Sequence, residues 1–342
     1  MDRWTIFWTL LCLAAGAAMV YFAAGRMRAD ARRTRPRFRT RLDLDEMDDL
    51  MQARRYEEAE KRCREVLERD EGDHEAHCYL ASCLMGEGRE DAARAELMGL
   101  AACARPRDPW VFSQLGYLFA EDGQVALARW ALDRGLELFP HDIDLLVSRS
   151  RMALDDGETM RALGYAQEAI LEDPRDVGAL WAKTVALEAL ESYDEAEACL
   201  ETLKEVSPDT TDVALEYAHI ALQQGRPDEA LEICDRELMK SPKNGLIYLA
   251  RATVMARSGN CEKALAQIER ARELGEPEDS LAWTSLEPLC GLGRKDEAYA
   301  ILDGLIRRES PLLDTLQTEA FRKDYPLLTA QEDFRDFLEK RQ

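Results

Sequence analysis

The sequence predicts an all-α protein, an α-solenoid of about eight helix pairs preceded by one transmembrane helix. Three observations support this fold: residues that recur every 34 positions, a short turn sequence shared by successive units, and a long uncharged stretch near the N-terminus. A fixed period of this length is typical of solenoids in which each repeat is a pair of helices. Because solenoids present extended binding surfaces, the period indicates a protein that binds other molecules.

Proline, alanine and glycine follow the 34-residue period. The prolines are Pro106, Pro140, Pro174, Pro208 and Pro242. The alanines are Ala128, Ala162, Ala196, Ala230, Ala264 and Ala298. The glycines are Gly123, Gly157, Gly225, Gly259 and Gly293, with Glu191 in the one missing place. Since glycine and proline both end helices, their spacing marks the helix boundaries within each unit.

The turn at Gly225 illustrates how one unit is built. Glycine adopts the left-handed conformation that ends the first helix, and Pro227 suits the first turn of the second helix. Asp228 and Glu229 follow, where the helix dipole favours negative charge. Ala230 is small at the point where the two helices are expected to cross closely. This order of residues therefore predicts a helix, a tight turn and a second helix.

The same turn recurs as Tyr56-Glu57-Glu58-Ala59, Tyr193-Asp194-Glu195-Ala196 and Lys295-Asp296-Glu297-Ala298. In its period, this turn and the proline that closes each unit, the chain resembles the tetratricopeptide repeat (TPR) family, of the N-terminally membrane-anchored type. The resemblance covers about four-fifths of the chain. It implies eight units at about 40–73, 74–108, 109–142, 143–176, 177–210, 211–244, 245–278 and 279–312.

Four segments are predicted along the chain: a short N-terminus with the anchor at 1–25, an arginine-rich stalk at 26–41, the repeat array at 42–312 and capping helices at 313–342. The first unit has Arg54 and Arg55 where most other units have the turn glycine. Pro288 lies inside the first helix of the last unit and is expected to kink it. Beyond the array, aromatic residues at helical spacing predict two short helices over its end; they are Phe321, Tyr325, Phe334 and Phe337.

Residues 4–25 contain no charged side chain. At about 1.5 Å per residue, a helix of this length just crosses a hydrocarbon core of about 30 Å. Only Arg3 precedes it, whereas Arg26, Arg28, Arg32, Arg33, Arg35, Arg37, Arg39 and Arg41 follow it. A cleavable signal peptide has a shorter apolar core and carries its positive charge in front. We therefore expect a single-pass protein with its array in the cytoplasm, as in a bacterial inner membrane.

The charges of the two parts differ in sign. The first 41 residues hold nine arginines and two aspartates, a net charge of +7, whereas the whole chain carries −22. The remaining residues therefore carry −29. The segment from Arg26 to Arg41 is expected to attract anionic lipid. An acidic body repels nucleic acid, so the expected partners are neutral to basic proteins or peptides.

Residues suited to catalysis are scarce, and neither a phosphate-binding loop nor a nucleophile elbow is present. We therefore expect no enzyme activity and no cofactor. The candidate metal ligands are His74, His77 and Cys78, because histidine and cysteine on one helix face suit zinc. Ordinary helix residues are the favoured interpretation of this cluster. The nine cysteines contain no Cys-x-x-Cys pair and are read as small buried residues of a reducing compartment.

The resemblance implies that the first helices of the units line a groove for peptides. The side chains expected there are Trp110, Ser113, Tyr117, Arg151, Trp181, Glu188, His219, Gln223 and Thr253. The alternative is that the aromatic members pack between units. The expected function is a membrane-anchored scaffold that recruits or assembles other proteins at the cytoplasmic face. Two alternatives remain open: a bacterial regulator of envelope or lipopolysaccharide synthesis, and a protein similar to organelle import receptors.

The arginines after residue 25 predict the orientation of the chain in the membrane. A C-terminal reporter that is active only in an oxidising, exported compartment should stay inactive, because positive flanks are retained in the cytoplasm. Replacing the eight arginines by glutamine should weaken or invert this orientation. Full reporter activity in the unaltered chain would contradict the expected topology.

Overall fold

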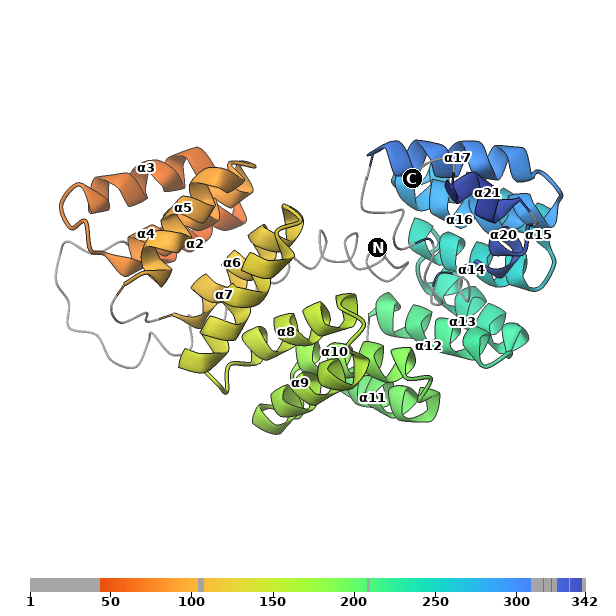
Figure 1. Cartoon of the computed structure of the whole chain (residues 1–342), viewed down its shortest axis with the longest axis horizontal. Helices are drawn as coiled ribbons and strands as arrows, with labels where there is room; N and C mark the ends of the chain where they lie inside the picture. Colours follow the sequence, from red (N-terminus) through yellow and green to blue (C-terminus); the bar gives the residue numbers. More distant parts are fainter. Residues whose placement is uncertain are drawn as a thin grey trace. The chain divides into compact units, whose positions relative to one another are not determined.

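A computed structural model of the chain describes residues 44–103, 108–207 and 210–308, together with 316, 321, 325–331 and 333–339. Every regular element in these ranges is an α-helix (Figure 1). The expected membrane span at 4–25 and the arginine-rich segment at 26–41 lie outside the described residues. Among the helices that are described, none is both long and apolar enough to cross a bilayer.

The described helices form consecutive pairs joined by short turns, which confirms the predicted all-α solenoid. The pairs are α2 (Leu44–Gln52) with α3 (Tyr56–Leu67), α4 (His74–Gly86) with α5 (Glu90–Ala101), α6 (Pro109–Glu121) with α7 (Val125–Leu138), α8 (Ile143–Asp155) with α9 (Thr159–Glu172), α10 (Val177–Ala189) with α11 (Tyr193–Val206), α12 (Thr211–Gln223) with α13 (Pro227–Lys240), α14 (Gly245–Arg257) with α15 (Cys261–Glu273), and α16 (Glu278–Gly291) with α17 (Lys295–Arg308). Two short helices follow, α20 (Pro326–Thr329) and α21 (Phe334–Glu339).

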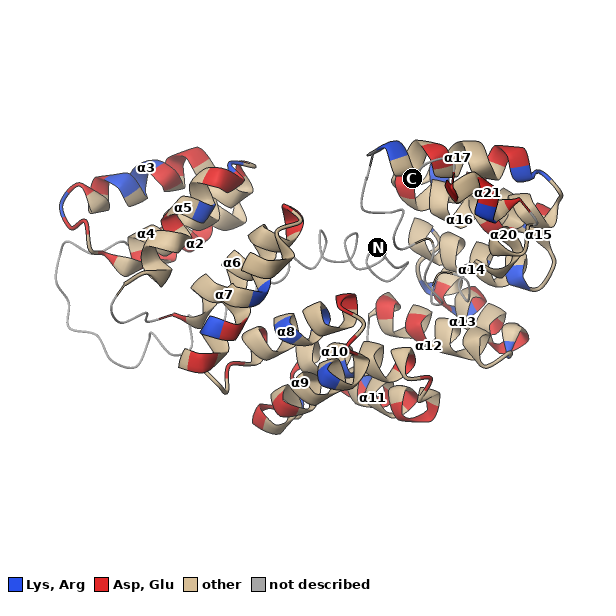
Figure 2. Ribbon diagram, in the orientation of Figure 1, with Lys and Arg blue, Asp and Glu red and all other residues tan. Residues whose placement is uncertain are grey.

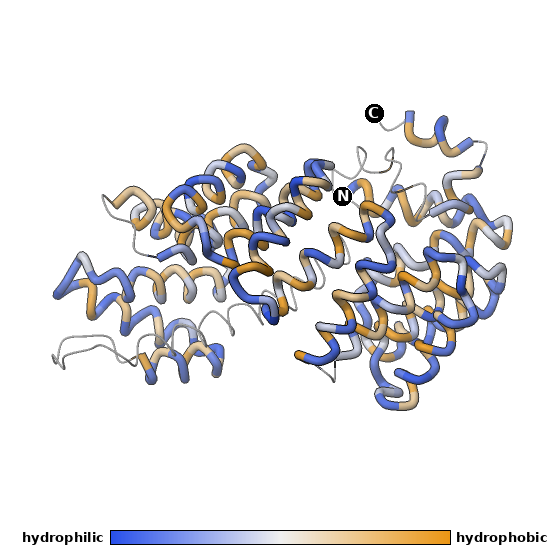
Figure 3. The backbone as a smooth tube through the Cα atoms, turned by 90° about the horizontal axis from the view of Figure 1, so that it is seen from below, coloured by the Kyte–Doolittle hydropathy of each residue, from blue (hydrophilic) through white to orange (hydrophobic). Residues whose placement is uncertain are grey.

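The pairs are grouped into two compact units that divide between Ala182 and Lys183, within α10. In the N-terminal unit, α6 packs against its partner α7 and also against α8. In the C-terminal unit, α14 packs against its partner α15 and against α12 and α16. First helices of successive pairs therefore contact one another. Hydrophobic and hydrophilic stretches alternate along the helices (Figure 3), as expected where one side packs and the other is solvated.

A residue with positive φ separates the two helices of every described pair. In the pair α12–α13 this residue is Gly225, with φ of 73°. The N–H of Arg226 donates to the carbonyl of Ala221 at 2.8 Å, and the N–H of Gly225 donates to that of Leu222 at 3.1 Å. These two bonds form a Schellman cap, which satisfies carbonyls left unbonded at the helix end.

Two pairs adopt the same left-handed turn without glycine. Glu191 has φ of 58°, and Arg54 has φ of 55°. Glu191 stands in the gap of the glycine series, and Arg54 occupies the corresponding place of the first pair. A Cβ atom is unfavourable in this conformation, so both positions carry backbone strain that the surrounding helices hold in place.

A capping aspartate or asparagine immediately precedes most of the first helices, at the repeat spacing. The side chains of Asp73, Asp108, Asp142, Asp176 and Asn244 each accept a hydrogen bond from a backbone N–H of the helix that follows, at 2.9–3.0 Å. Such caps satisfy N–H groups that have no partner within the helix, and each is worth about 1 kcal/mol. The cap and the glycine turn together determine where each first helix begins and ends.

The alanines of the period lie at the centre of each pair. All eight are completely shielded from solvent; they are Ala59, Ala93, Ala128, Ala162, Ala196, Ala230, Ala264 and Ala298. At Ala162 the backbone carbonyl accepts a hydrogen bond from the hydroxyl of Ser150 on the partner helix, at 2.8 Å. This bond requires the backbones of the two helices to approach closely, in agreement with the small residue that the sequence places there.

Successive pairs are also joined by repeated ion pairs. Nε of Arg149 on α8 lies 2.7 Å from Oδ1 of Asp133 on α7, and Nε of Arg251 on α14 lies 2.7 Å from Oδ1 of Asp235 on α13. Both pairs span 16 residues and occupy equivalent positions in their repeats. Arg149 is only 2% exposed, and its guanidinium also lies over the ring of Tyr165 on α9.

The C-terminal helices close the end of the C-terminal unit. Phe321, Tyr325, Phe334 and Phe337 are buried in one cluster with Trp283 of α16. The buried carboxylate of Glu287 accepts hydrogen bonds from the N–H groups of Leu327 and Leu328 at 3.1 and 2.9 Å. The helix α16 continues through Pro288 and ends at Gly291. Aromatic packing and one carboxylate thus fasten the C-terminal helices to the last pair.

Because Gly225 is left-handed and Gly164 is helical, alanine at these two positions should change the free energy of unfolding in opposite directions. Gly225→Ala should lower the free energy of unfolding by about 1–2 kcal/mol, because the added Cβ strains the backbone. No atom lies within 4 Å of that Cβ, so steric overlap does not contribute. Denaturant unfolding of the two proteins measures the difference.

Gly164→Ala is the matched control, because Gly164 lies within α9 and its Cβ would also meet nothing within 4 Å. Alanine there should raise the free energy of unfolding by roughly 0.5–1 kcal/mol, since it reduces the freedom of the unfolded chain. Equal effects of the two substitutions would show that left-handed geometry is not what position 225 requires.

Candidate functional site

The candidate surface of the N-terminal unit lies on the first helices α6, α8 and α10. Trp110, Ser113 and Tyr117 lie on α6 at spacings of three and four residues, which places them on one side of that helix. Arg151 lies on α8 and Trp181 on α10, and all five side chains are partly exposed. The hydroxyls of Ser113 and Ser148 lie 3.5 Å apart, so this side of α6 adjoins α8.

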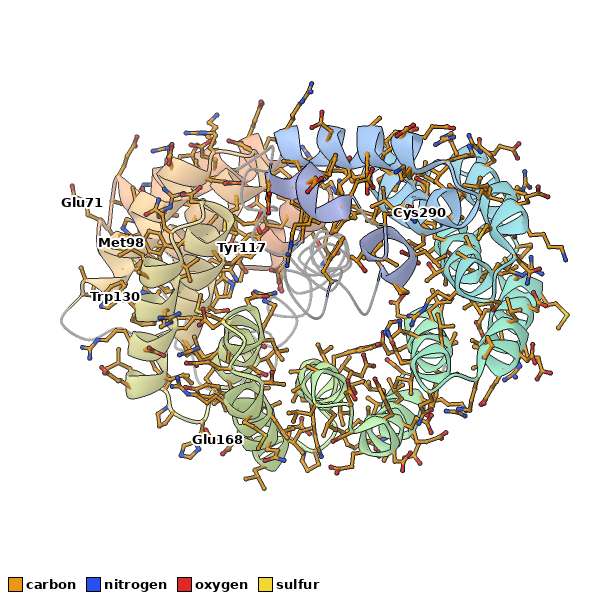
Figure 4. The ribbon with its side chains drawn as sticks, turned by 45° about the vertical axis from the view of Figure 1, so that its right-hand side comes forward. Glu71, Met98, Tyr117, Trp130, Glu168 and Cys290 are labelled. Atoms are coloured by element: carbon orange, nitrogen blue, oxygen red, sulfur yellow. The ribbon has the colours of Figure 1, made fainter. Side chains whose placement is uncertain are left out.

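The aromatic members combine the two roles that the sequence left open. Trp110 and Tyr117 pack against the hydrophobic core that contains Phe112 and Leu115, yet neither ring is fully buried. Figure 4 shows Tyr117 on the side of the α6–α7 pair opposite to Trp130, which is 47% exposed. A half-buried aromatic ring has a fixed position and a free face, which are the properties of a binding anchor.

Tyr117 and Arg151 occupy the same position of successive repeats, 34 residues apart. The next three units have Val185, His219 and Thr253 there. This position therefore changes from phenol to guanidinium, alkyl, imidazole and hydroxyl, whereas the alanine at the helix crossing does not change. Val185 is buried, whereas the other four residues are partly exposed. Variation at these four places, on a constant helix crossing, suits selective recognition of different groups.

In the C-terminal unit, the polar residues expected at the surface form hydrogen bonds within their own helices. The side-chain nitrogens of His219 and Gln223, one turn apart on α12, lie 3.1 Å from each other. The hydroxyl of Thr253 donates to the carbonyl of Leu249 on its own helix at 3.2 Å. His219 is therefore oriented by a neighbour, whereas Thr253 turns its hydroxyl back toward α14.

Glu188 differs from the other expected surface residues because it is only 7% exposed. It interacts with Glu216 on α12, which is 2% exposed. Burial raises the pKa of Glu216 to about 7; the interaction with Glu188 opposes this rise, and the charge of Asp212 adds to it. Burial disfavours the ionised form of a carboxyl group, so Glu188 and Glu216 form a buried pair that favours a retained proton.

The histidine and cysteine cluster is brought together in part. Nδ1 of His77 lies 2.8 Å from a carboxylate oxygen of Glu96, and its Nε2 lies 3.0 Å from the carbonyl of Glu71. His74 and Cys78 instead face Asp108, and their ligand atoms all lie within 4.8 Å of one another. The candidate trio therefore separates, and Asp108 rather than His77 lies beside His74 and Cys78.

A shallow depression between α2 and α3 is lined by charged residues, including Asp45, Glu46 and Asp49. The cations beside it are already paired, Arg55 with Glu58 at 2.6 Å and Arg62 with Glu46 at 3.3 Å. All four of these side chains are well exposed to solvent. Such surface ion pairs contribute little energy, and Leu50 is the one apolar residue among those that line the depression.

Comparison with known proteins supports the repeat type. A tetratricopeptide repeat model matches residues 50–111, and a second tetratricopeptide repeat model matches 147–205 and 185–245. A tetratricopeptide repeat protein from Parabacteroides merdae has a solved structure that aligns with 78% of this chain and 97% of its own, with a TM-score of 0.59 and 20% identity. At this identity the likeness concerns the fold alone. Residues 50–111 and 147–245 thus match TPR models, and the fold of the described helices agrees with this repeat type.

Two relatives have names that mention cellulose synthase operons. "Cellulose synthase 1 operon protein C" of Komagataeibacter xylinus is 24% identical over 206 residues, which cover 55% of this chain and 16% of that protein. "Cellulose synthase operon protein C" of Pseudomonas fluorescens is 26% identical over 222 residues, which cover 59% of this chain and 17% of that protein. This chain therefore matches only a small part of either relative.

The buried pair predicts how stability depends on pH. Glu216 has a reference pKa of 4.5 and a pKa of about 7 in the folded array, so the folded state retains a proton that the unfolded chain releases between these values. Its contribution to the free energy of unfolding therefore falls as pH rises from about 4.5 to 7. Glu216→Gln should remove this fall and stabilise the protein at pH 8 by on the order of 1–3 kcal/mol.

Urea unfolding at pH 4.5 and pH 8 measures the change in the free energy of unfolding caused by Glu216→Gln. This change should be close to zero at pH 4.5. Glu232→Gln, at an exposed position of α13, is the control and should change stability little at either pH. A gain of stability that is the same at pH 4.5 and pH 8 would mean that ionisation of Glu216 is not its cause.

Proposed function

We propose that this chain is a membrane-anchored scaffold whose TPR array binds other proteins through the exposed side of its first helices. The observation that carries the proposal is the half-buried position shared by Tyr117 and Arg151. Its chemistry differs among the repeats in which it is partly exposed, while the alanine at the helix crossing stays the same. A surface of this kind is suited to recognising an extended peptide or a helix, one group per repeat.

The aromatic side chains of the N-terminal unit are the proposed anchors. Trp110 and Tyr117 rest on the hydrophobic core on one side and remain accessible on the other, so they lose little entropy when a partner covers them. Trp181 on α10 is likewise partly exposed. Arg151 adds a cation that suits a carboxylate or a carbonyl of the bound segment.

Membrane anchoring is a proposal that rests on the sequence. Its support is the uncharged stretch at 4–25 and the arginines that follow it. The first described helix begins at Leu44, so the arginine-rich segment would connect the anchor to the array. This arrangement would hold the proposed binding surface at the cytoplasmic face, and the reporter fusion described above tests it.

The charge of the array favours particular partners. Acidic residues are distributed along helices of both units (Figure 2), and residues 42–342 carry a net charge of −29. Such a surface attracts neutral or basic proteins and repels nucleic acid. We propose no catalytic role, because the expected and observed polar clusters serve helix caps and contacts between helices.

A second candidate function is a role in bacterial envelope synthesis. It is favoured by the similarity to two bacterial relatives named for cellulose synthase operons, although each alignment takes in less than a fifth of the relative. In this form of the proposal, the partners of the array are proteins that make an envelope polysaccharide. The bacterial source of these relatives favours this candidate over a protein similar to organelle import receptors.

Replacing the three anchors tests the proposal. The triple variant Trp110→Ala, Tyr117→Ala and Trp181→Ala should lose partner binding, because a single aromatic anchor is commonly worth 2 kcal/mol or more, about thirtyfold in affinity. The measurement is quantitative co-purification of partners with the full-length chain from membranes of its host. Binding by the unaltered chain should also weaken with added salt.

Trp130→Ala is the matched control, since Trp130 is 47% exposed but lies on the second helix α7. It should leave binding unchanged. Circular dichroism shows whether each variant remains helical. Unchanged binding by the folded triple variant, or equal loss of binding in the control, would exclude the first-helix side as the binding surface.

A further inference from the structure

Three possible metal ligands from two successive repeats converge in the N-terminal unit. His74 and Cys78 lie one turn apart on α4, and Asp108 immediately precedes α6. One ligand atom from each side chain lies within 4.8 Å of the other two. Nε2 of His74 lies 3.9 Å from Oδ2 of Asp108. A nitrogen, a sulfur and an oxygen thus face one another, although 30 residues separate Cys78 from Asp108 along the chain.

Local contacts hold these atoms in place. Asp108 uses Oδ1 to accept the N–H of Trp110 at 3.0 Å, which leaves Oδ2 directed toward His74. Cys78 is only 6% exposed. Nε2 of His74 is shielded from solvent and has no hydrogen-bond partner among the described residues. A buried polar atom without a partner is costly and indicates that a bonded group belongs beside it.

The surroundings favour a cation. Asp73 caps α4 and Glu75 lies in its first turn, so with Asp108 three acidic residues lie at the end of this helix that carries His74 and Cys78. A divalent cation would stabilise both the carboxylate and the thiolate, because metal binding displaces protons from its ligands.

An ion pair between protonated His74 and Asp108 is the simpler alternative. It makes no use of Cys78, and 3.9 Å is too long for a hydrogen bond between the two side chains. Calcium and magnesium prefer oxygen ligands alone, whereas imidazole, thiolate and carboxylate together suit zinc. Zinc lies about 2.0–2.3 Å from such ligands, so small side-chain rotations would complete the coordination.

We propose that His74, Cys78 and Asp108 form a zinc site in which a water molecule supplies the fourth ligand. The site joins the first helix of one repeat to the residue that caps the first helix of the next. Bound zinc therefore fastens α4 to the start of α6 and stabilises the unit that carries Trp110 and Tyr117. This site goes beyond the proposed scaffold function, since partner binding does not require it.

Zinc titration of the full-length chain tests the site. After removal of metal with a chelator, the protein should bind one zinc ion per chain, measured by elemental analysis after gel filtration. Cys78→Ser and His74→Ala should weaken binding by at least about a hundredfold, because each removes a ligand. Asp108→Asn should do the same and keep α6 intact, since asparagine is an equally good helix cap.

Two controls have the same residue types in the same unit. Cys103→Ser and His141→Ala change exposed residues outside the cluster and should leave zinc binding unaltered. Cobalt gives a second readout, because the unaltered protein should show absorption from a cobalt–thiolate bond and Cys78→Ser should lose it. Failure of the unaltered chain to retain zinc would overturn the proposal, as would full retention by folded Asp108→Asn.

Discussion

The close crossing of two helices at an alanine is the constraint on which the array depends. In every described pair this alanine is completely buried, and at Ala162 the helices approach closely enough for a side chain to bond to the opposite backbone. A larger side chain would separate the helices and change their angle. Since each pair is the surface on which the next one packs, such a change would be passed on to its neighbours. The left-handed turn and the aspartate caps keep the helix ends in register with this crossing.

Stability and recognition are assigned to different positions of the repeat. The positions of Ala196 and Gly225 determine the helix pair, and they vary little along the chain. The position of Tyr117 and Arg151 is partly exposed except at Val185, and its residue differs in each of the five repeats compared. This separation allows the surface chemistry to change without altering the scaffold. The buried pair of Glu188 and Glu216 is an exception, because a first-helix residue that the sequence places at the surface is enclosed between helices.

The sequence was sufficient to predict the helix pairs because proline, glycine and alanine each have a direct effect on the backbone or on the distance between helices. Contacts between pairs were not predictable in the same way. Asp108 approaches His74, and Glu216 approaches Glu188, only after successive helices have packed. One signal was nevertheless present: an aspartate or asparagine precedes most first helices at the repeat spacing. Because first helices of successive units pack together, a residue that caps one first helix lies near the first helix of the preceding unit. This spacing would have placed Asp108 beside α4.

The C-terminal helices have a consequence for assembly. Each helix pair offers its successor an apolar face, so a last pair left bare would offer the same face to another molecule, and arrays could stack head to tail into filaments. Here the rings of Phe321 and Tyr325 cover α16, and the carboxylate of Glu287 holds the backbone of α20 against it. The apolar face of α16 is therefore covered by residues of the same chain, which leaves less of it open to a second molecule.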